Sequence, residues 1–424
     1  MKVPLKVDGG GKRFELDCGA MKSLKTTIRL VLACILVLSA LVPASTALAQ
    51  DLDQLAAVNN AFAFDLLKQI AMEQPGKNIF ISPFSVSTAL QMVGNGAAGE
   101  TKMEMQRVLK TDGLTAAELN AGCRELSQSL ASQNKVILDL ADGIWYQTGF
   151  HLKPDFIADN RNFFQAALES VDFTNPKSAV VINKWADKAT RGKIQNVVQF
   201  PFPPQTRVVL ANAIYFKGKW ENPFDKNNTR PRMFYQPGGA TNQTPMMSQR
   251  RNFAYQENAG FQGVRLPYAG GRLEMYLFLP ATNSSPQNML AGFSGENWRD
   301  TVLPQFADRE GMLVFPKFKL DYDVTLNEPL EQLGMRRAFS PDADFSAMAG
   351  EQLFVSEVNQ KSFVSVDEEG TEAAAVTTIM MAGRAIMEPI KPFEMIVDRP
   401  FFFVIADDQT GSILFMGIVE NPAP

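Results

Sequence analysis

Residues 367–389 form the segment that most constrains how this 424-residue chain folds. The segment starts at the end of a strand-like run, residues 362–366, and continues for more than 20 residues before the next strand-like run, residues 401–405. A loop of this length within a compact domain is uncommon and usually has a function. We therefore expect a fold in which an otherwise regular structure supports a long excursion near the C-terminal end.

Alternate residues of this segment are small or apolar, namely Thr371, Ala373, Ala375, Thr377, Ile379, Met381 and Gly383. The interleaved set starts with the charged Glu372. Because successive side chains of a strand point to opposite faces, the pattern predicts a latent strand with Thr371 on a buried face and Glu372 in solvent. Gly370 is a permissive pivot at its start. By composition alone, an Ala-rich exposed helix or a flexible linker fits equally well.

The rest of the chain divides into an early helical part and a late strand-rich part. Apolar residues recur at steps of three and four between Leu55 and Ile70, which predicts a helix that ends at Pro75 and Gly76. Residues 85–93 and 101–109 also have a helical pattern, whereas strand-type runs occupy residues 208–216, 272–279, 312–320, 362–366, 401–406 and 412–419. This order predicts an α+β fold, and the lack of repeats and long linkers in the sequence predicts one continuous domain.

An apolar, uncharged run at residues 30–42 follows a basic start and precedes a small-x-small sequence that ends at Ala49. This order is typical of a secretory signal peptide, because the run is short for a transmembrane helix. We expect cleavage after Ala49 and a secreted chain, either extracellular or periplasmic. The alternative is a membrane anchor, although no basic stop-transfer patch follows. Met21 is a candidate for the true start, because residues 1–20 would make the charged region unusually long.

The composition disfavours enzymes and nucleic-acid binders. The chain has a single histidine, His151, and removal of residues 1–49 leaves a single cysteine, Cys123. Any histidine-based metal site or catalytic triad would depend on His151 alone, so we expect no catalytic residue, no metal and no cofactor. We predict that both side chains are packed structurally. The formal net charge is -4, and -8 without residues 1–49, which predicts no nucleic-acid partner.

Several ordered motifs occur after residue 49: Asn78-Ile-Phe-Ile-Ser-Pro-Phe-Ser85, Asn183-Lys-Trp-Ala-Asp-Lys-Ala-Thr-Arg-Gly-Lys-Ile194, Asn212-Ala-Ile-Tyr-Phe-Lys-Gly-Lys-Trp220, Phe315-Pro-Lys-Phe-Lys319, Ala343-Asp-Phe-Ser346, Asp398-Arg-Pro-Phe401 and Leu414-Phe-Met-Gly417. With these motifs the chain resembles a serpin, a member of the serine protease inhibitor family, over nearly its whole mature length. The resemblance implies three β-sheets with eight to nine helices and an exposed reactive-centre loop at residues 368–392. It also implies a monomeric single domain over residues 50–424.

The resemblance also implies an inhibitory mechanism without catalytic residues. A serine protease attacks the loop as a substrate, and the loop then inserts as a new strand into the main sheet. The implied hinge residues are Glu368, Glu369, Gly370, Thr371, Glu372, Ala373, Ala374 and Ala375. The residues implied in conformational control are Ser82, Ser85, Asn212, Trp220, Lys317 and Gln360, the last at a position where many members carry histidine.

The family register sets the residue read by the protease fourteen residues after Gly370, which is Arg384, followed by Ala385. A long cation suits a trypsin-like protease whose pocket carries a carboxylate. Alternatively, Arg384 only keeps an exposed loop soluble, or the protease uses another bond, near Met380, Met381 or Met387. A non-inhibitory serpin that acts as carrier, chaperone or plain substrate is the other class, although the hinge has no proline to indicate it.

Overall fold

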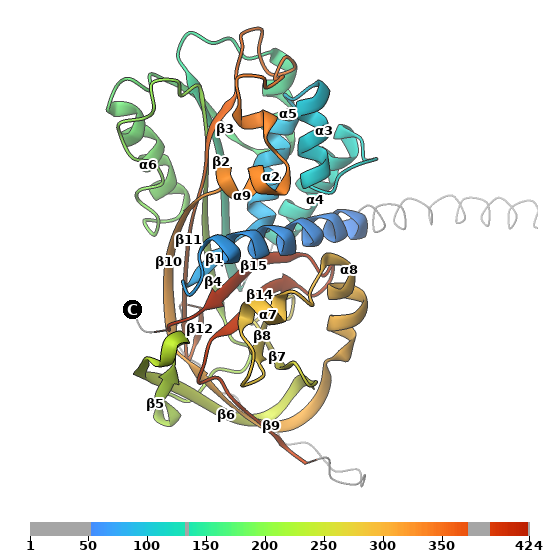
Figure 1. Cartoon of the computed structure of the whole chain (residues 1–424), viewed down its shortest axis with the longest axis vertical. Helices are drawn as coiled ribbons and strands as arrows, with labels where there is room; N and C mark the ends of the chain where they lie inside the picture. The colour runs from blue at the N-terminus through green and yellow to red at the C-terminus, as the bar shows by residue number, and fades with distance from the viewer. Residues whose placement is uncertain (1–51, 132–134, 372–390, 423–424) are drawn as a thin grey trace, which may run out of the picture. The chain divides into compact units, whose positions relative to one another are not determined.

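The computed structural model of this chain describes residues 52–131, 135–371 and 391–422. Within the unit Leu52–Pro424, hydrogen bonding connects the described strands into one sheet of six strands and one of nine (Figure 1). The expected signal peptide lies outside the described residues, as do residues 372–390 of the expected reactive-centre loop.

The six-stranded sheet has the strand order β10-β11-β12-β4-β2-β3. Its strands are β10 (Phe318–Thr325), β11 (Val355–Asp367), β12 (Gly370–Thr371), β4 (Val208–Lys219), β2 (Val136–Gln147) and β3 (Ala167–Val171). Strand β11 pairs directly with β4 in parallel over most of its length, whereas the two-residue strand β12 lies between them at one end. The candidate functional site is built around this short strand.

Strand β4 is buried on both faces, which its continuous apolar run favours. Alternate residues on one face belong to an apolar cluster shared with helix α6 (Lys177–Ala189), namely Val209, Ala211 and Ala213. Residues on the other face belong to the main core, namely Val208, Leu210 and Ile214. Figure 1 shows α6 on the side of the sheet opposite to helix α2 (Pro83–Gly94). The sheet is therefore the middle layer between helices.

The nine-stranded sheet has the order β1-β15-β14-β8-β7-β6-β9-β13, and β5 pairs with β6. Its strands are β1 (Ile79–Ile81), β15 (Ile413–Val419), β14 (Phe401–Asp407), β8 (Leu273–Pro280), β7 (Phe261–Pro267), β6 (Thr241–Glu257), β9 (Ala307–Pro316), β13 (Phe393–Ile396) and β5 (Arg230–Tyr235). Because β6 pairs with β7 at one end and with β5 and β9 along the rest, the three sheets that the serpin resemblance implies are joined here into two.

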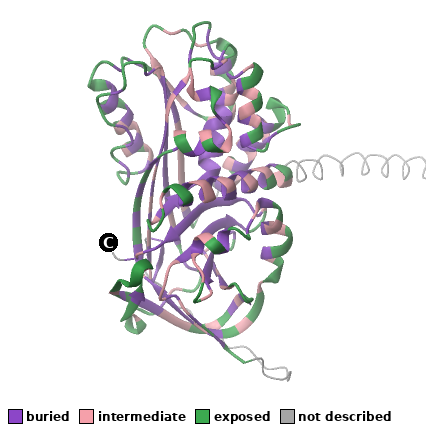
Figure 2. Ribbon diagram, viewed as in Figure 1, coloured by how far each residue is buried: buried purple, intermediate pink, exposed green. Residues whose placement is uncertain are grey.

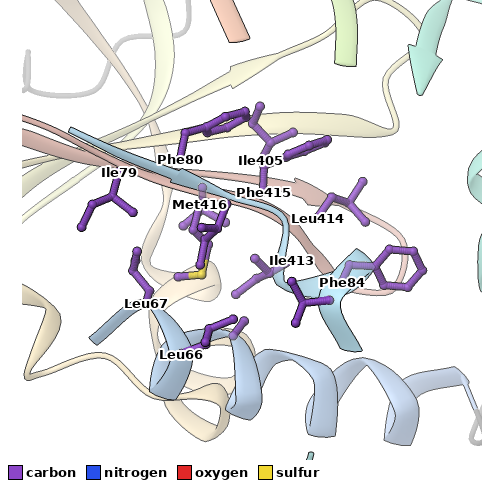
Figure 3. Close-up of a cluster of buried hydrophobic side chains, with 14 of the residues drawn as sticks. Leu66, Leu67, Ile79, Phe80, Phe84, Ile405, Ile413, Leu414, Phe415 and Met416 are labelled. Atoms are coloured by element: carbon purple, nitrogen blue, oxygen red, sulfur yellow. The ribbon is translucent and has the colours of Figure 1, made fainter. Parts of the chain in front are cut away.

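Strands β1, β14 and β15 contribute a block of fully buried side chains to the core. The ring of Phe80 stacks on that of Phe415, with 5.4 Å between ring centroids and an interplanar angle of 9°. Leu66 and Leu67, from the helix over residues 52–73, reach the same cluster (Figure 3). The long strands and the inner faces of the helices are buried, whereas the outer helix faces and the turns are exposed (Figure 2).

The other described α-helices are α3 (Gly99–Val108), α4 (Ala116–Ala131), α5 (Pro154–Phe164), α7 (Pro286–Leu290), α8 (Gly295–Asn297) and α9 (Asn327–Leu333). Helix α2 starts where the Ser82 hydroxyl accepts a hydrogen bond from Ser85 N–H and Pro83 fixes the first turn. The three helices predicted at residues 55–70, 85–93 and 101–109 and the α+β class are thus confirmed. No helix in the described part of the chain is long and apolar enough to span a membrane.

The single strand predicted at residues 312–320 is wrong, because the chain changes sheets within it. Strand β9 ends at Pro316 and β10 starts at Phe318. Proline has no N–H to donate to a sheet, and Lys317 N–H instead donates to the Pro245 carbonyl at 3.0 Å. The strand predicted at residues 362–366 is only the end of the 13-residue β11. The first half of β11 contains several polar residues and so lacks the apolar run by which a strand is predicted.

Candidate functional site

The short strand β12 lies where β11 and β4 have separated. Thr371 pairs with Val366 of β11 and with Gly218 of β4, antiparallel to both strands. Further along the sheet, β11 and β4 pair directly with each other, and Gln360 lies opposite Asn212. At Thr371 the chain thus points into a seam between two hydrogen-bonded strands. A longer strand could form there only if β11 and β4 moved apart by about one strand spacing, 4.8 Å.

Gly370 occupies a position that only glycine fits. Its φ of +143° is rare for residues with a side chain. A Cβ atom at this position would lie 2.3 Å from the Gly218 carbonyl oxygen and 2.6 Å from Lys219 Cα. These separations are far below van der Waals contact. The close pairing of β12 with β4 therefore depends on the missing side chain.

Thr371 is fully buried, as the alternating pattern predicts. Its hydroxyl lies 3.0 Å from the Tyr268 hydroxyl. The Tyr268 ring stacks on Trp220, with 4.7 Å between centroids and an angle of 16°, and the Trp220 indole N–H donates to the Asp367 carbonyl at 3.0 Å. Burial raises the pKa of Tyr268, so its hydroxyl is neutral at physiological pH. Two aromatic rings thus form the floor beneath the start of the hinge.

Two acidic residues at the turn between β11 and β12 are bound by separate partners. The Glu368 carboxylate lies 2.8 Å from Lys317 Nζ and accepts a hydrogen bond from the Thr229 hydroxyl at 2.7 Å. Glu369 forms an ion pair with Lys226. Burial raises the pKa of Glu368, but the bonds from Lys317 and Thr229 outweigh burial and hold this pKa below its ordinary value. Glu368 is therefore ionised at neutral pH.

The backbone of the same turn is bonded to the segment that follows β4. Trp220 N–H donates to the Glu369 carbonyl at 3.0 Å, and Phe224 N–H donates to the Glu368 carbonyl at 2.8 Å. The Asp367 side chain accepts a bond from Glu369 N–H at 2.9 Å. The structure thus brings together three residues named from the sequence, Trp220, Lys317 and Glu368, around the start of the hinge.

A second polar cluster lies where β11 and β4 pair directly. The fully buried Gln360 side chain accepts a bond from Ser82 N–H at 2.9 Å and donates to the Ser82 carbonyl at 3.0 Å and to Asn212 Oδ1 at 2.9 Å. The Asn212 amide donates to the Ser85 hydroxyl and to Asp142 Oδ1, the latter at 2.5 Å. Separation of β11 from β4 must break the bond between Gln360 and Asn212.

Sequence reasoning missed Asp142, Tyr268, Thr229 and Lys226. Burial raises the pKa of Asp142 to about 7, against the lowering effect of the Asn212 amide. All four lie far in sequence from the residues they contact and carry no local pattern. Only the alignment of β2 with β4, in which Asp142 lies opposite Asn212, could have indicated one of them.

The predicted residues of the loop itself lie outside the described residues: Arg384, Ala385, Met380, Met381, Met387, Glu372, Ala373, Ala374 and Ala375. Of the two residues predicted to pack structurally, Cys123 is buried, and burial raises its pKa to about 12. The prediction for His151 is wrong. Its side chain is 88% exposed, 3.2 Å from Glu351, because the flanking Phe150 and Leu152 pack against the core instead. The described residues contain no cluster that could hold a metal ion.

Residues 57–422 match the family model described as Serpin (serine protease inhibitor). The chain belongs to the serpin family. It is 38% identical over 371 residues to an uncharacterized serpin-like protein of Thermococcus kodakarensis, and the match covers 86% of this chain and 84% of that protein. It is 36% identical over 386 residues to the leukocyte elastase inhibitor of Bos taurus, covering 88% and 100% respectively.

The solved structures similar to this serpin include human thyroxine-binding globulin complexed with thyroxine. The TM-score is 0.80 at 28% identity, and the match covers 88% of this chain and 100% of that chain. Relatives of this serpin include proteins named as protease inhibitors, whereas thyroxine-binding globulin is named for the thyroxine that it binds. Family membership therefore establishes the fold, and the activity has to be argued from the site.

Proposed function

We propose that this serpin inhibits a trypsin-like serine protease by trapping it covalently. The mature chain starts at Gln50, acts as a secreted monomer and presents residues 368–392 as its reactive-centre loop. The protease serine attacks the carbonyl carbon of Arg384, and the bond between Arg384 and Ala385 breaks. The new amino group of Ala385 takes up a proton, and an ester between the protease serine and Arg384 remains.

The position of Thr371 carries this proposal. It is fully buried and already paired with both β11 and β4, which supports a strand that would be inserted from this residue onwards. Addition of a strand to a sheet is driven by main-chain hydrogen bonds. Growth of β12 along the seam would replace the direct pairing of β11 with β4 by pairing on both sides of a new strand.

Insertion of the loop provides the force that distorts the protease. The fourteen residues from Thr371 to Arg384 span about 46 Å as a strand, at about 3.3 Å per residue. A protease held by an ester at Arg384 travels this distance as the strand forms. If insertion is faster than hydrolysis of the ester, the protease is trapped. If hydrolysis is faster, the chain is only a substrate.

Incubation with trypsin tests the proposal directly. We expect an SDS-resistant complex and a released peptide whose mass corresponds to residues 385–424. Trypsin whose active serine has been chemically blocked is the control and forms no covalent complex. Cleavage without a complex contradicts covalent trapping and favours a plain substrate. A trypsin complex with a peptide of another mass moves the reactive bond away from Arg384. A complex that forms only with a protease preferring apolar residues favours a bond near Met380, Met381 or Met387.

A carrier role is the second candidate, because the similar solved structures include thyroxine-binding globulin in complex with thyroxine. The sequence after Gly370 argues against it, since Thr371, Ala373 and Ala375 suit the buried face of an inserted strand. A chain that forms no complex with several serine proteases of different specificity would favour the non-inhibitory class.

A further inference from the structure

A pocket of about 360 Å³ lies beneath the six-stranded sheet, next to the cluster around Asn212. Its walls come mainly from α2, α4, α5, β2 and β3, which lie together in the upper part of Figure 1. Aromatic and aliphatic side chains form much of the lining, including Phe84, Phe163, Phe164, Leu138 and Leu140. Pockets of this size and character take small organic molecules.

Two side chains of opposite charge also line the pocket, Asp142 of β2 and Arg124 of α4. The Arg124 guanidinium lies over the Phe163 ring, 5.1 Å from its centroid, so this cation already has a partner. The Asp142 carboxylate is bound by the neutral Asn212 amide, and among the described residues no cation forms an ion pair with it. Neither charge has an ion-pair partner among the described residues, but the Arg124 guanidinium is engaged by the Phe163 ring, so the Asp142 carboxylate is the group left to pair with an added ion.

We propose that the pocket binds a small organic cation with an aromatic or aliphatic body, whose ammonium group pairs with Asp142. The ammonium group would donate a charge-assisted hydrogen bond to the carboxylate, and the body of the ligand would pack against the phenylalanine and leucine walls. No function described above uses this pocket, and neither the family match nor the relatives assign it.

The state of ionisation of Asp142 fits this ligand. Burial raises its pKa to about 7, and the carboxylate becomes ionised as the pH rises through that value. The other titratable groups near it are Arg124 and the buried Cys123, both on α4. The nearby polar residues from α2, β4 and the segment between α5 and β3 are uncharged: Ser85, Thr88, Asn212 and Gln165. Affinity for a cation therefore increases with pH through about 7.

The pocket also gives its ligand an influence on loop insertion, which rests on the function proposed above. Asp142 binds Asn212, and Asn212 binds Gln360 across the seam that must open. Strands β2 and β4 are paired from Val136 to Tyr146, so they shift together relative to α2, which forms the opposite wall. A ligand that fits the closed sheet stabilises that state and slows insertion.

Three probes that share an indole ring test the site on the full chain by isothermal titration. At about pH 8 we expect tryptamine, a cation, to bind more tightly than tryptophan, a zwitterion, and indole propionate, an anion. Asp142→Asn weakens tryptamine binding by about tenfold or more, as expected for loss of a charge-assisted bond. Asp139→Asn is the matched control and leaves binding unchanged. Asp139 lies on the same strand as Asp142, β2, but its carboxylate is paired with Arg191.

The outcomes show whether the ligand is bound through the Asp142 carboxylate or through another group. Tighter binding of indole propionate, or unchanged tryptamine binding by Asp142→Asn, overturns the proposal. If Asp142→Asn fails to fold, the wild-type chain still decides, because tryptamine affinity must fall when the pH is lowered to about 6. An affinity that is independent of pH overturns the assignment to Asp142.

A second measurement addresses loop insertion. Saturating tryptamine should lower the fraction of trypsin trapped as covalent complex, and Asp142→Asn should abolish this effect. Hydrolysis of a small chromogenic substrate by trypsin, without the serpin, controls for any action of tryptamine on the protease. The titration contains no protease, so absence of complex formation refutes the proposed function while leaving the binding result valid. An unchanged trapped fraction despite saturation refutes the regulatory step.

Discussion

Gly370 lies where two backbones approach too closely for a side chain. Gly370→Ala places a methyl group 2.3 Å from the Gly218 carbonyl oxygen, at a φ that alanine rarely adopts. We predict a loss of about 2–4 kcal/mol in the free energy of unfolding, or displacement of β12 from the sheet. Urea unfolding measures the first outcome, and limited proteolysis near residue 370 measures the second.

Gly238→Ala is the control for the backbone conformation alone. Gly238 also has a positive φ, +76°, but an added Cβ would meet nothing within 4 Å. Its replacement should cost about 1 kcal/mol. Equal losses for the two variants would mean that close contact with β4 does not require a glycine at position 370.

Asp142 predicts a pH dependence of stability with a definite sign. Its folded pKa of about 7 lies above the ordinary 3.8, so the folded chain retains a proton that the unfolded chain loses. The stability contributed by this group is present below about pH 4 and is lost as the pH rises through about 7. The free energy of unfolding of Asp142→Asn, relative to that of the wild type, should therefore be higher at about pH 8 than at about pH 4, as measured by urea unfolding. Asp139→Asn is the control, and an identical difference at both pH values refutes this reading of Asp142.

At the scale of elements, the pairing of β11 with β4 depends on the Gln360 side chain. Gln360→Leu keeps the volume but leaves the Ser82 backbone groups and Asn212 Oδ1 without these bonds. The Ser82 carbonyl still accepts a bond from Val86 N–H, so two buried groups are left unpaired, each at a cost of about 1–3 kcal/mol. We predict a loss of about 2–4 kcal/mol in the free energy of unfolding and faster amide hydrogen exchange in β4 and β11.

Gln91→Leu is the matched control for Gln360→Leu. Gln91 is also a buried glutamine, but its Nε2 atom has no hydrogen-bond partner among the described residues. Its replacement should cost less than 1 kcal/mol. If both variants lose the same stability, the bonds of Gln360 do not hold the two strands together.

Because Thr371 of β12 is already paired with β11 and β4, substitutions at this residue test whether insertion starts there. Thr371→Arg would bring a charge into a site that is fully buried between β11 and β4 and above Tyr268. We predict that trypsin still cleaves this variant but forms no SDS-resistant complex with it, as judged by gel electrophoresis. Thr371→Ser keeps the hydroxyl and should trap trypsin like the wild type. Trapping by the arginine variant would refute insertion that starts at Thr371.

Local pattern predicted the elements whose residues all face one kind of environment. The helix at residues 85–93 and the strand at residues 401–406 are buried throughout, and the structure has α2 and β14 there. The first half of β11 was missed because Asn359, Gln360 and Lys361 are polar. Gln360 is polar but not solvent-exposed, because it is buried and hydrogen bonded to Ser82 and Asn212.

The site could be predicted only as far as the motifs extend. They indicated Trp220, Lys317 and Gln360, because these lie within or close to recognisable runs. The partners Tyr268 and Thr229 lie in turns and short segments whose sequences have no periodicity. Their contacts with Thr371 and Glu368 depend on how distant strands are aligned, which a single sequence does not encode locally.

At the scale of the whole molecule, insertion predicts a change in thermal stability. In the described state β11 and β4 share a single set of hydrogen bonds over most of their length. An inserted strand adds a second set and buries the small and apolar face of the loop. In the proposed mechanism, cleavage at Arg384 would release the loop to make this change. We predict that the cleaved chain unfolds at a higher temperature than the intact chain, by at least about 10 °C. For a domain of this size, with an unfolding entropy of about 2.1 cal/mol/K per residue, this shift corresponds to about 8 kcal/mol of added stability.

Circular dichroism of the intact chain and of the chain cleaved by a catalytic amount of trypsin measures this shift. The cleaved Thr371→Arg variant is the control, since its loop is cut but its first residue does not enter the sheet. It should unfold at the temperature of its own intact form. If the cleaved wild type also keeps its original unfolding temperature, cleavage does not lead to insertion, and the stored free energy needed to trap a protease is absent. A rise in both chains would locate the insertion elsewhere than the seam between β11 and β4.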